Sequence, residues 1–272
     1  GRNEQALAHA GSALAKASGR RQTLAVTASI GPGAMNLVTA AALATVNRLP
    51  LLLLPGDTYA TKRQGPVLQE LENPQDADLT VNDAFRPVSA FFARITRPEQ
   101  LITALPKAFR VLANPAETGA VVLSLPQDIQ SHAFDFPVSL FRERDWTIRR
   151  TIPQPGELDR AASVLATAKK PVIIAGGGVH YSQAREALAE FAGSTGIPVA
   201  ETFGGKGAAL SDADWALGGI GLEGNPATNR LVAQADVIVS IGTRLTDFAT
   251  GSQTMFKNPD VSFMAINIAE LD

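Results

Sequence analysis

The sequence predicts an α/β protein with doubly wound parallel sheets, on the basis of three observations. Short, almost wholly apolar runs such as 51–54 and 120–125 recur along the chain, and strands buried on both faces have this composition. Segments with apolar residues at helical spacing alternate with these runs. Glycine-rich turns follow some of the runs, as at 31–33 and 176–178. Together they indicate βαβ units whose parallel strands are covered by helices on both faces.

The first half of the chain contains one such alternation and one long polar segment. We expect that segment, residues 58–82, to be a surface or active-site segment, because it carries charges of both signs and has no clear period. The expected elements around it are a helix over 4–18, a strand over 23–28, a helix over 34–46, a strand over 50–55, a helix over 98–112 and a strand over 120–125.

The alternation stops after residue 131 in a stretch that is rich in Phe, Arg and Pro, and it restarts near residue 157. The elements expected there are helices over 157–168, 182–194 and 226–233 and strands over 171–175, 197–200, 236–241 and 262–268. The sequence therefore predicts two domains, 1–137 and 156–272, joined by a linker over 138–155. The two halves share this style but have no fixed-period repeat.

The composition excludes several classes of function. The chain has 272 residues with 24 basic and 26 acidic side chains, which gives no reason to expect nucleic acid or a membrane surface as partner. It has no cysteine, so disulfides and thiolate chemistry are excluded. The histidines His9, His132 and His180 lack metal-ligand spacing, and we expect no metal site in this segment. With no signal peptide and no long apolar run, we expect a cytoplasmic protein.

Two features near the N-terminus have both a structural and a functional interpretation. The turn Gly31-Pro32-Gly33 is explained by a tight bend with Pro32 at a helix start, and the tripeptide alone favours this explanation. Alternatively, bare backbone at a helix N-terminus lets a ligand approach. Glu4 follows a plausible N-cap, Asn3, and there it favours the helix dipole. The functional alternative is a buried glutamate with a chemical task.

Two turns in the second half lie where a doubly wound domain binds ligands. Gly176-Gly177-Gly178 follows a strand, but the G-x-G-x-x-G spacing for a dinucleotide is not satisfied; Glu201 is the possible ribose-binding acid. Gly242-Thr243-Arg244 and Asp247 follow another strand, and either ligand contact or a structural Arg–Asp pair explains them.

Three segments, in this order, resemble one enzyme family. "NEQ" at 3–5 is similar to an H-E-Q-type helix start, "TASIGPGAMN" at 27–36 to a T-S-G-P-G-A-T-N loop, and "KPVIIAGGG" at 170–178 to the start of a central domain. This is the thiamine-diphosphate family of acetohydroxyacid synthase. The resemblance implies a pyrimidine-binding domain and a Rossmann-like central domain, both truncated, and we expect the chain to be an excerpt of a longer protein.

The resemblance also implies roles for individual residues. The glutamate at the Glu4 position bonds the aminopyrimidine of thiamine diphosphate and promotes the imino tautomer that deprotonates the thiazolium carbon. Such a glutamate should be shielded, with a raised pKa. Gly31, Pro32 and Gly33 would lie beside the pyrimidine, where side chains would clash. Asn36 would order that loop, and Gln69 would face the substrate.

Within the family, three details are similar to a hydrolytic branch. Asn3 replaces the commoner His, and the runs "LLLLPGDT" at 51–58 and "RQGPVLQE" at 63–70 match that branch. The implied reaction is C–C bond hydrolysis, which opens a small, cyclic, polyol-derived dione to a deoxy-glucuronic acid in myo-inositol catabolism. Two alternatives stay open: an acetolactate-synthase-like carboligase or decarboxylase of 2-oxo acids, and a non-catalytic nucleotide-binding module.

The family binds diphosphate and Mg²⁺ through a third domain that carries a Gly-Asp-Gly motif and a later Asn, and no such stretch occurs here. The resemblance therefore implies that the Mg²⁺ ligands lie outside this segment, which alone would be inactive and bind cofactor poorly. It also implies a homodimer or homotetramer with active sites shared between subunits. The central domain is similar to those that bind FAD, but we expect no FAD here.

Overall fold

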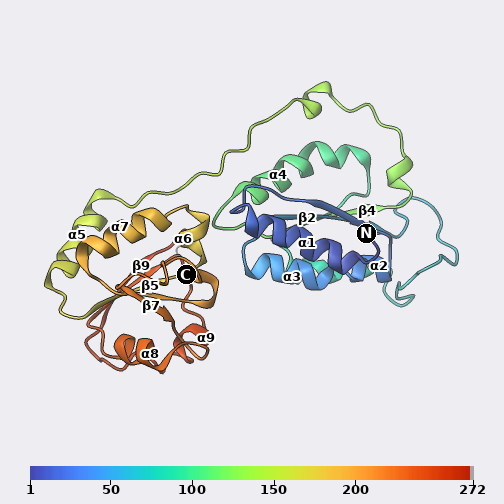
Figure 1. Ribbon diagram of the computed structural model, residues 1–272. Coiled ribbons are helices and arrows are strands. Elements are labelled where there is room, and N and C mark those ends of the chain that lie inside the picture. Colours follow the sequence, from blue (N-terminus) through green and yellow to red (C-terminus); the bar gives the residue numbers. More distant parts are fainter. Residues whose placement is uncertain (270–272) are drawn as a thin grey trace. The chain divides into compact units, whose positions relative to one another are not determined.

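The chain folds into two compact units, Gly1–Arg149 and Arg150–Asp272, in a computed structural model that describes residues 1–269 (Figure 1). The division between them falls within 138–155, the range that the sequence analysis assigns to the linker. Each unit has its own wholly parallel sheet.

The first unit contains a four-stranded sheet in the order β1-β2-β4-β3. Its strands are β1 (Ala25–Ala28), β2 (Leu51–Asp57), β3 (Phe91–Arg94) and β4 (Ala120–Pro126). Its α-helices are α1 (Glu4–Ala17), α2 (Pro32–Met35), α3 (Val38–Val46) and α4 (Leu101–Ala113). Short 3₁₀ turns complete it: η1 (Val81–Val88), η2 (Pro98–Gln100), η3 (Ile129–Ser131) and η4 (Val138–Phe141).

Helices cover both faces of this sheet. Helices α1 and α3 pack on each other and on β2, while α4 packs on β3 and β4, and Figure 1 shows α4 on the side opposite to α1 and α3. Asn3 caps α1, because its Oδ1 accepts the Ala6 N–H at 2.8 Å. Gly11 allows α1 to approach β2 closely, since a Cβ there would lie 2.6 Å from Leu51 Cδ1. The start of α1, with Glu4, is thereby fixed relative to the sheet.

The second unit contains a five-stranded sheet in the order β7-β6-β5-β8-β9. Its strands are β5 (Pro171–Ala175), β6 (Val199–Glu201), β7 (Ala216–Gly219), β8 (Val237–Ile241) and β9 (Ser262–Ile266). Its helices are α5 (Pro155–Thr167), α6 (Gly177–Tyr181), α7 (Arg185–Thr195), α8 (Pro226–Ala233), α9 (Asp247–Thr250) and the 3₁₀ turn η5 (Phe203–Gly205).

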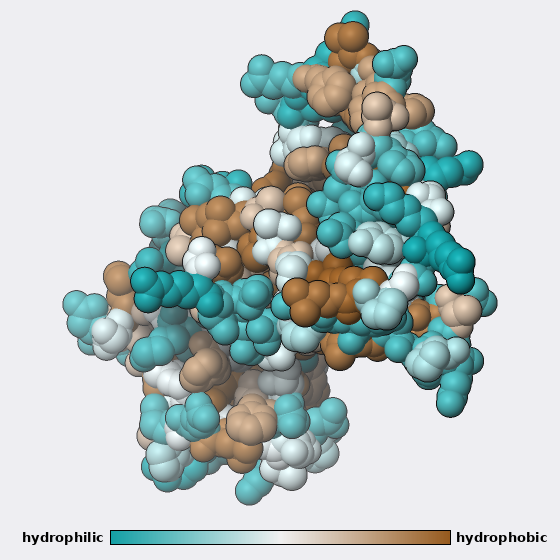
Figure 2. All heavy atoms as spheres, turned by 90° about the vertical axis from the view of Figure 1, so that its right-hand side faces the viewer, coloured by the Kyte–Doolittle hydropathy of each residue, from teal (hydrophilic) through white to brown (hydrophobic). Residues whose placement is uncertain are grey.

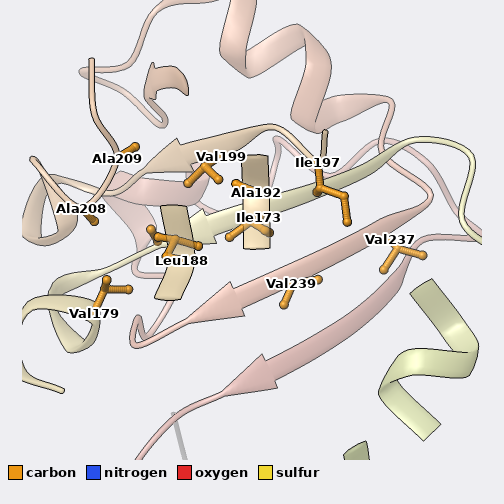
Figure 3. Packing of buried hydrophobic residues seen from close by; sticks show 11 residues of the cluster. Ile173, Val179, Leu188, Ala192, Ile197, Val199, Ala208, Ala209, Val237 and Val239 are labelled. Carbon is orange, nitrogen blue, oxygen red and sulfur yellow. The ribbon is translucent and has the colours of Figure 1, made fainter. Parts of the chain in front are cut away.

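Strand β5 shows why this sheet is covered on both sides. Ile173 points to one face, into a cluster with Val199, Val239 and the α7 residue Leu188 (Figure 3). Val172 and Ile174 point to the other face, where they belong to a separate buried cluster that includes the α8 residue Val232. Because both faces are buried, the strand has no polar residue, and the predicted doubly wound α/β class is confirmed.

Some local features differ from the expectations. Strands β3 and β7 were not expected: β3 is a four-residue edge strand, and β7 includes Gly218 and Gly219, which weaken a strand pattern. The single helix expected over 34–46 is two helices, α2 and α3. The break arises because the Leu37 N–H bonds the Ala34 carbonyl at 3.0 Å, which tightens the turn between them.

Candidate functional site

A pocket of about 560 Å³ opens in the first unit, where β1, β2 and β4 end. The carboxyl ends of parallel strands are the usual ligand-binding edge of such sheets. The lining residues come from the end of β1 and its turn, the end of β2, the following polar segment, and the end of β4: Thr27, Ala28, Ser29, Ile30, Leu54, Gly56, Tyr59, Gly65, Pro66, Val67, Leu68, Gln69, Leu125, Gln127 and Gln130. The expected active-site role of 58–82 thus gains a location.

The turn Gly31-Pro32-Gly33 joins β1 to α2 beside this pocket. Gly31 has φ +64°, a left-handed conformation that glycine adopts without strain, and Pro32 is the first residue of α2. A Cβ on Gly31 would lie 2.0 Å from the Gln69 carbonyl oxygen, so the polar segment leans directly on this glycine. Gly33 lies near two polar side chains, because a Cβ there would be 2.7 Å from Ser29 Oγ and 3.5 Å from Glu4 Oε1.

Glu4 and Asn36 meet although they are 32 residues apart. The Asn36 Nδ2 donates to Glu4 Oε2 at 3.1 Å, which joins the start of α1 to the end of α2. The carboxylate is partly exposed, and hydrogen bonds from its own backbone N–H and from Asn36 lower the pKa of Glu4. The expectation of a shielded glutamate with a raised pKa is therefore wrong for this chain, because hydrogen bonds to the charged form outweigh the slight burial.

Gln69 reaches the same place from the polar segment. Ser29 Oγ donates to Gln69 Oε1 at 3.2 Å, and Gln69 adopts a left-handed φ of +67°. The structure thus brings the predicted residues into one neighbourhood. Gly33 and Asn36 lie beside the Glu4 carboxylate, and Gly31 lies against Gln69, which lines the pocket. No local sequence pattern links these segments.

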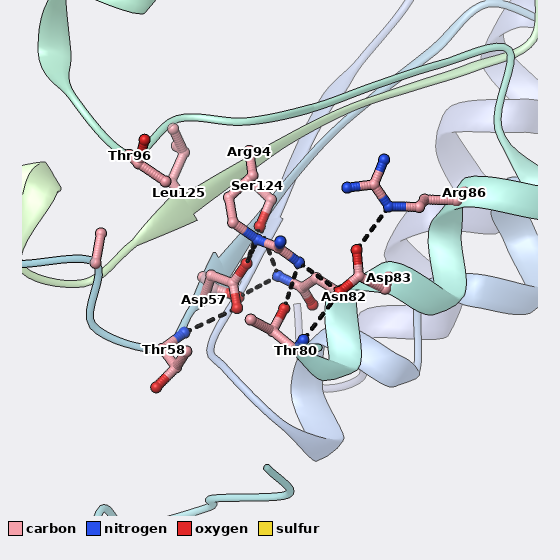
Figure 4. A network of polar contacts seen from close by, with 12 residues as sticks. Asp57, Thr58, Thr80, Asn82, Asp83, Arg86, Arg94, Thr96, Ser124 and Leu125 are labelled. Atoms are coloured by element: carbon pink, nitrogen blue, oxygen red, sulfur yellow. Dashed lines mark hydrogen bonds and ion pairs between the residues drawn. The ribbon is translucent and has the colours of Figure 1, made fainter. Parts of the chain in front are cut away.

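A buried ionic network, which the sequence analysis missed, lies under the ends of β2 and β4 (Figure 4). Arg94 bridges two carboxylates, with Nε 2.9 Å from Asp57 Oδ2 and Nη2 2.9 Å from Asp83 Oδ2. Ser124 donates to Asp57, and Asn82 Nδ2 donates to Ser124 Oγ at 2.9 Å. Asp57 is the last residue of the otherwise apolar strand β2, which was a visible signal, but its partner Arg94 lies 37 residues away.

The charges in this network support one another. Burial alone would lower the pKa of Arg94, but hydrogen bonds to Asp83 and Asp57 raise it. Burial alone would raise the pKa of Asp83, and hydrogen bonds from Arg86, the Thr80 N–H and Arg94 lower it. The network fixes the edge of the sheet on which the pocket is built, because the Gln127 N–H also bonds the Asp57 carbonyl at 3.1 Å.

The glycine turn of the second unit has a structural explanation. The Gly176 N–H donates to the Ile241 carbonyl at 2.8 Å, and the Gly178 N–H to the Gly242 carbonyl at 2.9 Å. A Cβ on Gly178 would lie 2.5 Å from Gly242 Cα, so these glycines let two turns pack together. Glu201, the possible ribose-binding acid, is buried and accepts the Ala209 N–H at 2.8 Å. The turn therefore gives no separate indication of a nucleotide.

Metal-binding clusters and membrane-spanning helices are both absent from residues 1–269. Within that range no group of three or more His, Cys, Asp or Glu side chains is placed to hold a metal ion. Among the same residues no helix has both the length and the apolar composition needed to cross a membrane.

Comparison with protein families matches both units. Residues 1–78 match "Thiamine pyrophosphate enzyme, N-terminal TPP binding domain", and residues 158–272 match "Thiamine pyrophosphate enzyme, central domain". The chain belongs to the thiamine pyrophosphate enzymes. Residues 4–36 of the candidate site and the pocket residues up to Gln69 fall inside the range matched to the N-terminal domain, whereas Leu125, Gln127 and Gln130 lie outside it.

Among the thiamine pyrophosphate enzymes, several curated relatives that are similar to this chain share one name. The chain is 50% identical over 270 residues to a protein of Clostridium perfringens (strain ATCC 13124), and 49% identical to proteins of Clostridium botulinum (strain Alaska E43) and Bacillus anthracis. All three are named 3D-(3,5/4)-trihydroxycyclohexane-1,2-dione hydrolase. Each alignment covers 99% of this chain and 42% of the relative, so the chain spans less than half the length of these proteins.

Proposed function

We propose that this chain forms the pyrimidine-binding and central domains of a thiamine-diphosphate-dependent C–C bond hydrolase. Its substrate would be 3D-(3,5/4)-trihydroxycyclohexane-1,2-dione, whose ring opens to a deoxy-glucuronic acid in myo-inositol catabolism. The relatives that carry this name support the proposal at 49–50% identity. The activity would belong to the whole protein, and this segment alone would be inactive.

The polar groups of the pocket wall are the observation on which the proposed substrate class rests. Among the described residues that line the pocket, none has a charged side chain, and the polar ones are hydroxyls and amides: Thr27, Ser29, Tyr59, Gln69, Gln127 and Gln130. Hydroxyls and amides both donate and accept hydrogen bonds, which suits the hydroxyl and carbonyl groups of a neutral polyol dione. A 2-oxo acid carries a carboxylate, for which a site normally supplies Arg or Lys. The wall therefore favours the dione over the 2-oxo acid alternative.

The residues around Glu4 fit the pyrimidine of the cofactor. Gly33 keeps the surroundings of the carboxylate uncrowded, because a Cβ there would lie 3.5 Å from Glu4 Oε1 and only 2.7 Å from Ser29 Oγ. Glu4 would bond the pyrimidine ring nitrogen there, Asn36 would orient the carboxylate, and the Gly31-Pro32-Gly33 backbone would lie beside the ring. When bound, thiamine diphosphate supplies a thiazolium carbon that attacks carbonyl carbons and stabilises the resulting negative charge.

Proton control would be the task of Glu4. In the chain alone, hydrogen bonds from its own N–H and from Asn36 lower the pKa of Glu4, which favours the charged form and makes it a weak base. Cofactor and neighbouring protein surfaces would exclude water from it, and that desolvation would raise its pKa toward the value that proton exchange with the ring nitrogen requires. Gln69, at the pocket wall, would bond the substrate.

Three properties of the whole protein belong to the same proposal. Mg²⁺ would be held, together with the diphosphate, by a part of the protein outside this chain. The protein would be cytoplasmic and would form a homodimer or homotetramer with shared active sites. Exposed apolar side chains support the association: Val46, Leu68 and Leu71 are at least half exposed, and Figure 2 shows hydrophobic patches on one face of the molecule.

The test is turnover by the full-length protein with thiamine diphosphate and Mg²⁺, comparing the trihydroxycyclohexanedione with pyruvate. We expect ring opening of the dione and little turnover of pyruvate. Turnover of pyruvate without turnover of the dione would keep the family and discard the substrate. Binding of FAD or NAD without either activity would favour a nucleotide-binding module instead.

A further inference from the structure

Asp128 lies between two residues of the pocket wall but takes no part in the wall itself. It follows Gln127 and precedes the 3₁₀ turn that carries Gln130, and both glutamines line the pocket. Its side chain is 1% exposed, so it does not reach the pocket or the solvent. Burying a carboxylate costs free energy unless hydrogen-bond donors surround it. The contacts of Asp128 supply such donors.

Both carboxylate oxygens of Asp128 are occupied by donors, most of them from a distant segment. Oδ1 accepts the N–H groups of Ala60 at 3.0 Å and of Ile129 at 3.1 Å. Oδ2 accepts the N–H and the hydroxyl of Thr61 at 2.8 and 2.6 Å and the N–H of Lys62 at 3.1 Å. The donors at 60–62 directly follow Tyr59, another lining residue. Asp128 therefore ties the β4 side of the pocket to the segment that begins at Tyr59.

That segment has few other means of keeping its shape. Between β2 and η1 the described residues form no helix or strand. Farther along, Gln64 Nε2 donates to Glu70 Oε1 at 3.0 Å, and the Val67 N–H donates to Glu70 Oε2 at 3.3 Å. Single side-chain bonds hold the far end: Thr58 Oγ1 donates to Gln64 Oε1, and Ser29 Oγ donates to Gln69 Oε1 at 3.2 Å. The near end is held by four hydrogen bonds to one carboxylate, that of Asp128.

We propose that Asp128 is a positioning residue for substrate recognition. It holds the Tyr59–Gln69 segment in register with Gln127 and Gln130, so that the neutral donors and acceptors of the two walls match one polyol substrate. This inference rests on the proposed function, because it assigns a task to the same pocket. A wall displaced by a fraction of a substrate's size loses several weak hydrogen bonds at once, which weakens binding more than it slows chemistry.

The test uses the full-length protein with thiamine diphosphate and Mg²⁺, and the variants Asp128→Asn and Asp236→Asn. Asparagine keeps the shape of Asp128 but places an NH₂ group against backbone donors. Asp236 is the matched control: its carboxylate accepts the N–H groups of Lys169 and Lys170 at 2.7 and 2.8 Å, in the other unit. We expect Asp128→Asn to lower kcat/KM for the dione roughly tenfold to a hundredfold, mainly through KM.

A second readout does not depend on activity. Trypsin cuts after Lys62 and Arg63, and we expect faster cleavage there in Asp128→Asn but not in Asp236→Asn. Equal KM values in the two variants would overturn the positioning role, whether or not cleavage changes.

If Asp128→Asn does not fold, Thr61→Val removes a single donor and should raise KM about threefold; an unchanged KM would again overturn the positioning role. If the wild-type protein does not open the dione, the proposed function is wrong. If trypsin cleavage after Lys62 and Arg63 is unchanged in Asp128→Asn, Asp128 does not anchor the segment.

Discussion

The two units place glycines at the same topological position, after the carboxyl end of a parallel strand, and use them differently. In the second unit Gly176 and Gly178 are covered by the turn at Gly242, whose carbonyl accepts the Gly178 N–H. In the first unit Gly33 faces the side chains of Ser29 and Glu4 next to an open pocket.

Sheet order explains the difference. β5 lies in the middle of its sheet, between β6 and β8, and turns after neighbouring strands crowd its end. A Cβ on Gly205, which follows β6, would lie 2.1 Å from the Ala175 carbonyl oxygen. β1 is an edge strand, with a neighbour on one side only, so its end stays more open. A glycine-rich turn thus shows that something approaches the backbone. At Gly176, Gly178 and also Gly31 it is another stretch of backbone, whereas Gly33 faces only side chains beside the pocket.

The largest expected effect is on the stability of the first unit. Replacing Arg94 by Met leaves the buried Asp57 without its cation, while Asp83 keeps Arg86, and this should cost about 3–5 kcal/mol of unfolding free energy. Single-tryptophan variants can report on each unit, since Trp146 stacks on Phe109 in the first and Trp215 packs on the core of the second. The denaturation midpoint reported by Trp146 should fall, and the midpoint reported by Trp215 should stay the same.

The control for that experiment is Arg86→Met. The Arg86 side chain is 57% exposed and pairs with Asp83 at the surface, so its loss should cost less than about 1 kcal/mol. Equal shifts for the two arginine variants would mean that the buried network contributes no more than a surface ion pair.

The next effect concerns catalysis in the first unit. Glu4→Gln keeps the size and the helix start but removes the proton acceptor, so kcat of the full-length protein should fall about a hundredfold or more. Glu186→Gln is the matched variant, because Glu186 occupies the first turn of α7 in the other unit. A similar kcat for Glu4→Gln and wild type would reduce Glu4 to a helix-start residue.

Alanine at the glycines tests the comparison directly. Gly178→Ala puts a Cβ 2.5 Å from the Gly242 backbone, and we expect a loss of about 1–3 kcal/mol of stability. Gly33→Ala meets the Ser29 hydroxyl, which can rotate away, so it should cost less stability but weaken thiamine diphosphate binding in the full-length protein. Thermal unfolding and cofactor titration measure the two effects. A reversed pattern would remove the distinction between the units.

The smallest effect is a difference in acid sensitivity. Burial alone would raise the pKa of Asp128, but hydrogen bonds from Thr61 and the neighbouring N–H groups hold it well below its usual range. A depressed folded pKa gives stability above the unfolded value of about 4, and this is lost as pH falls through the folded pKa. Glu72 opposes this weakly, because burial and then Asp57 raise its pKa.

The first unit should therefore lose stability below about pH 4. In the second unit Asp236 has a pKa lowered by N–H groups at Lys169 and Lys170, but it lies at the surface, where the effect is small. Acid titration of the two single-tryptophan variants should show the Trp146 transition at a higher pH than the Trp215 transition. The opposite order would place the acid-sensitive contacts in the second unit.

The sequence by itself determined the α/β class, most of the strands, and the helix start and the turn from which the candidate site is built. These features are local: apolar runs define buried strands, Asn3 and Glu4 define a helix start, and Gly31-Pro32-Gly33 defines a turn, each within a few residues. Short elements such as β3 and β7 gave too little pattern to be found, since their pairing with a neighbouring strand, and not their composition, makes them strands.

Tertiary structure alone decided which of these local features work together. The Glu4–Asn36 contact spans 32 residues, the Asp57–Arg94 pair 37, and the contacts of Asp128 with 60–62 span 66 to 68. Single residues at such separations leave no periodic trace in a sequence, because their position depends on strand order and on the path of the chain between them. The open end of an edge strand and the crowded end of a central strand differ for the same reason.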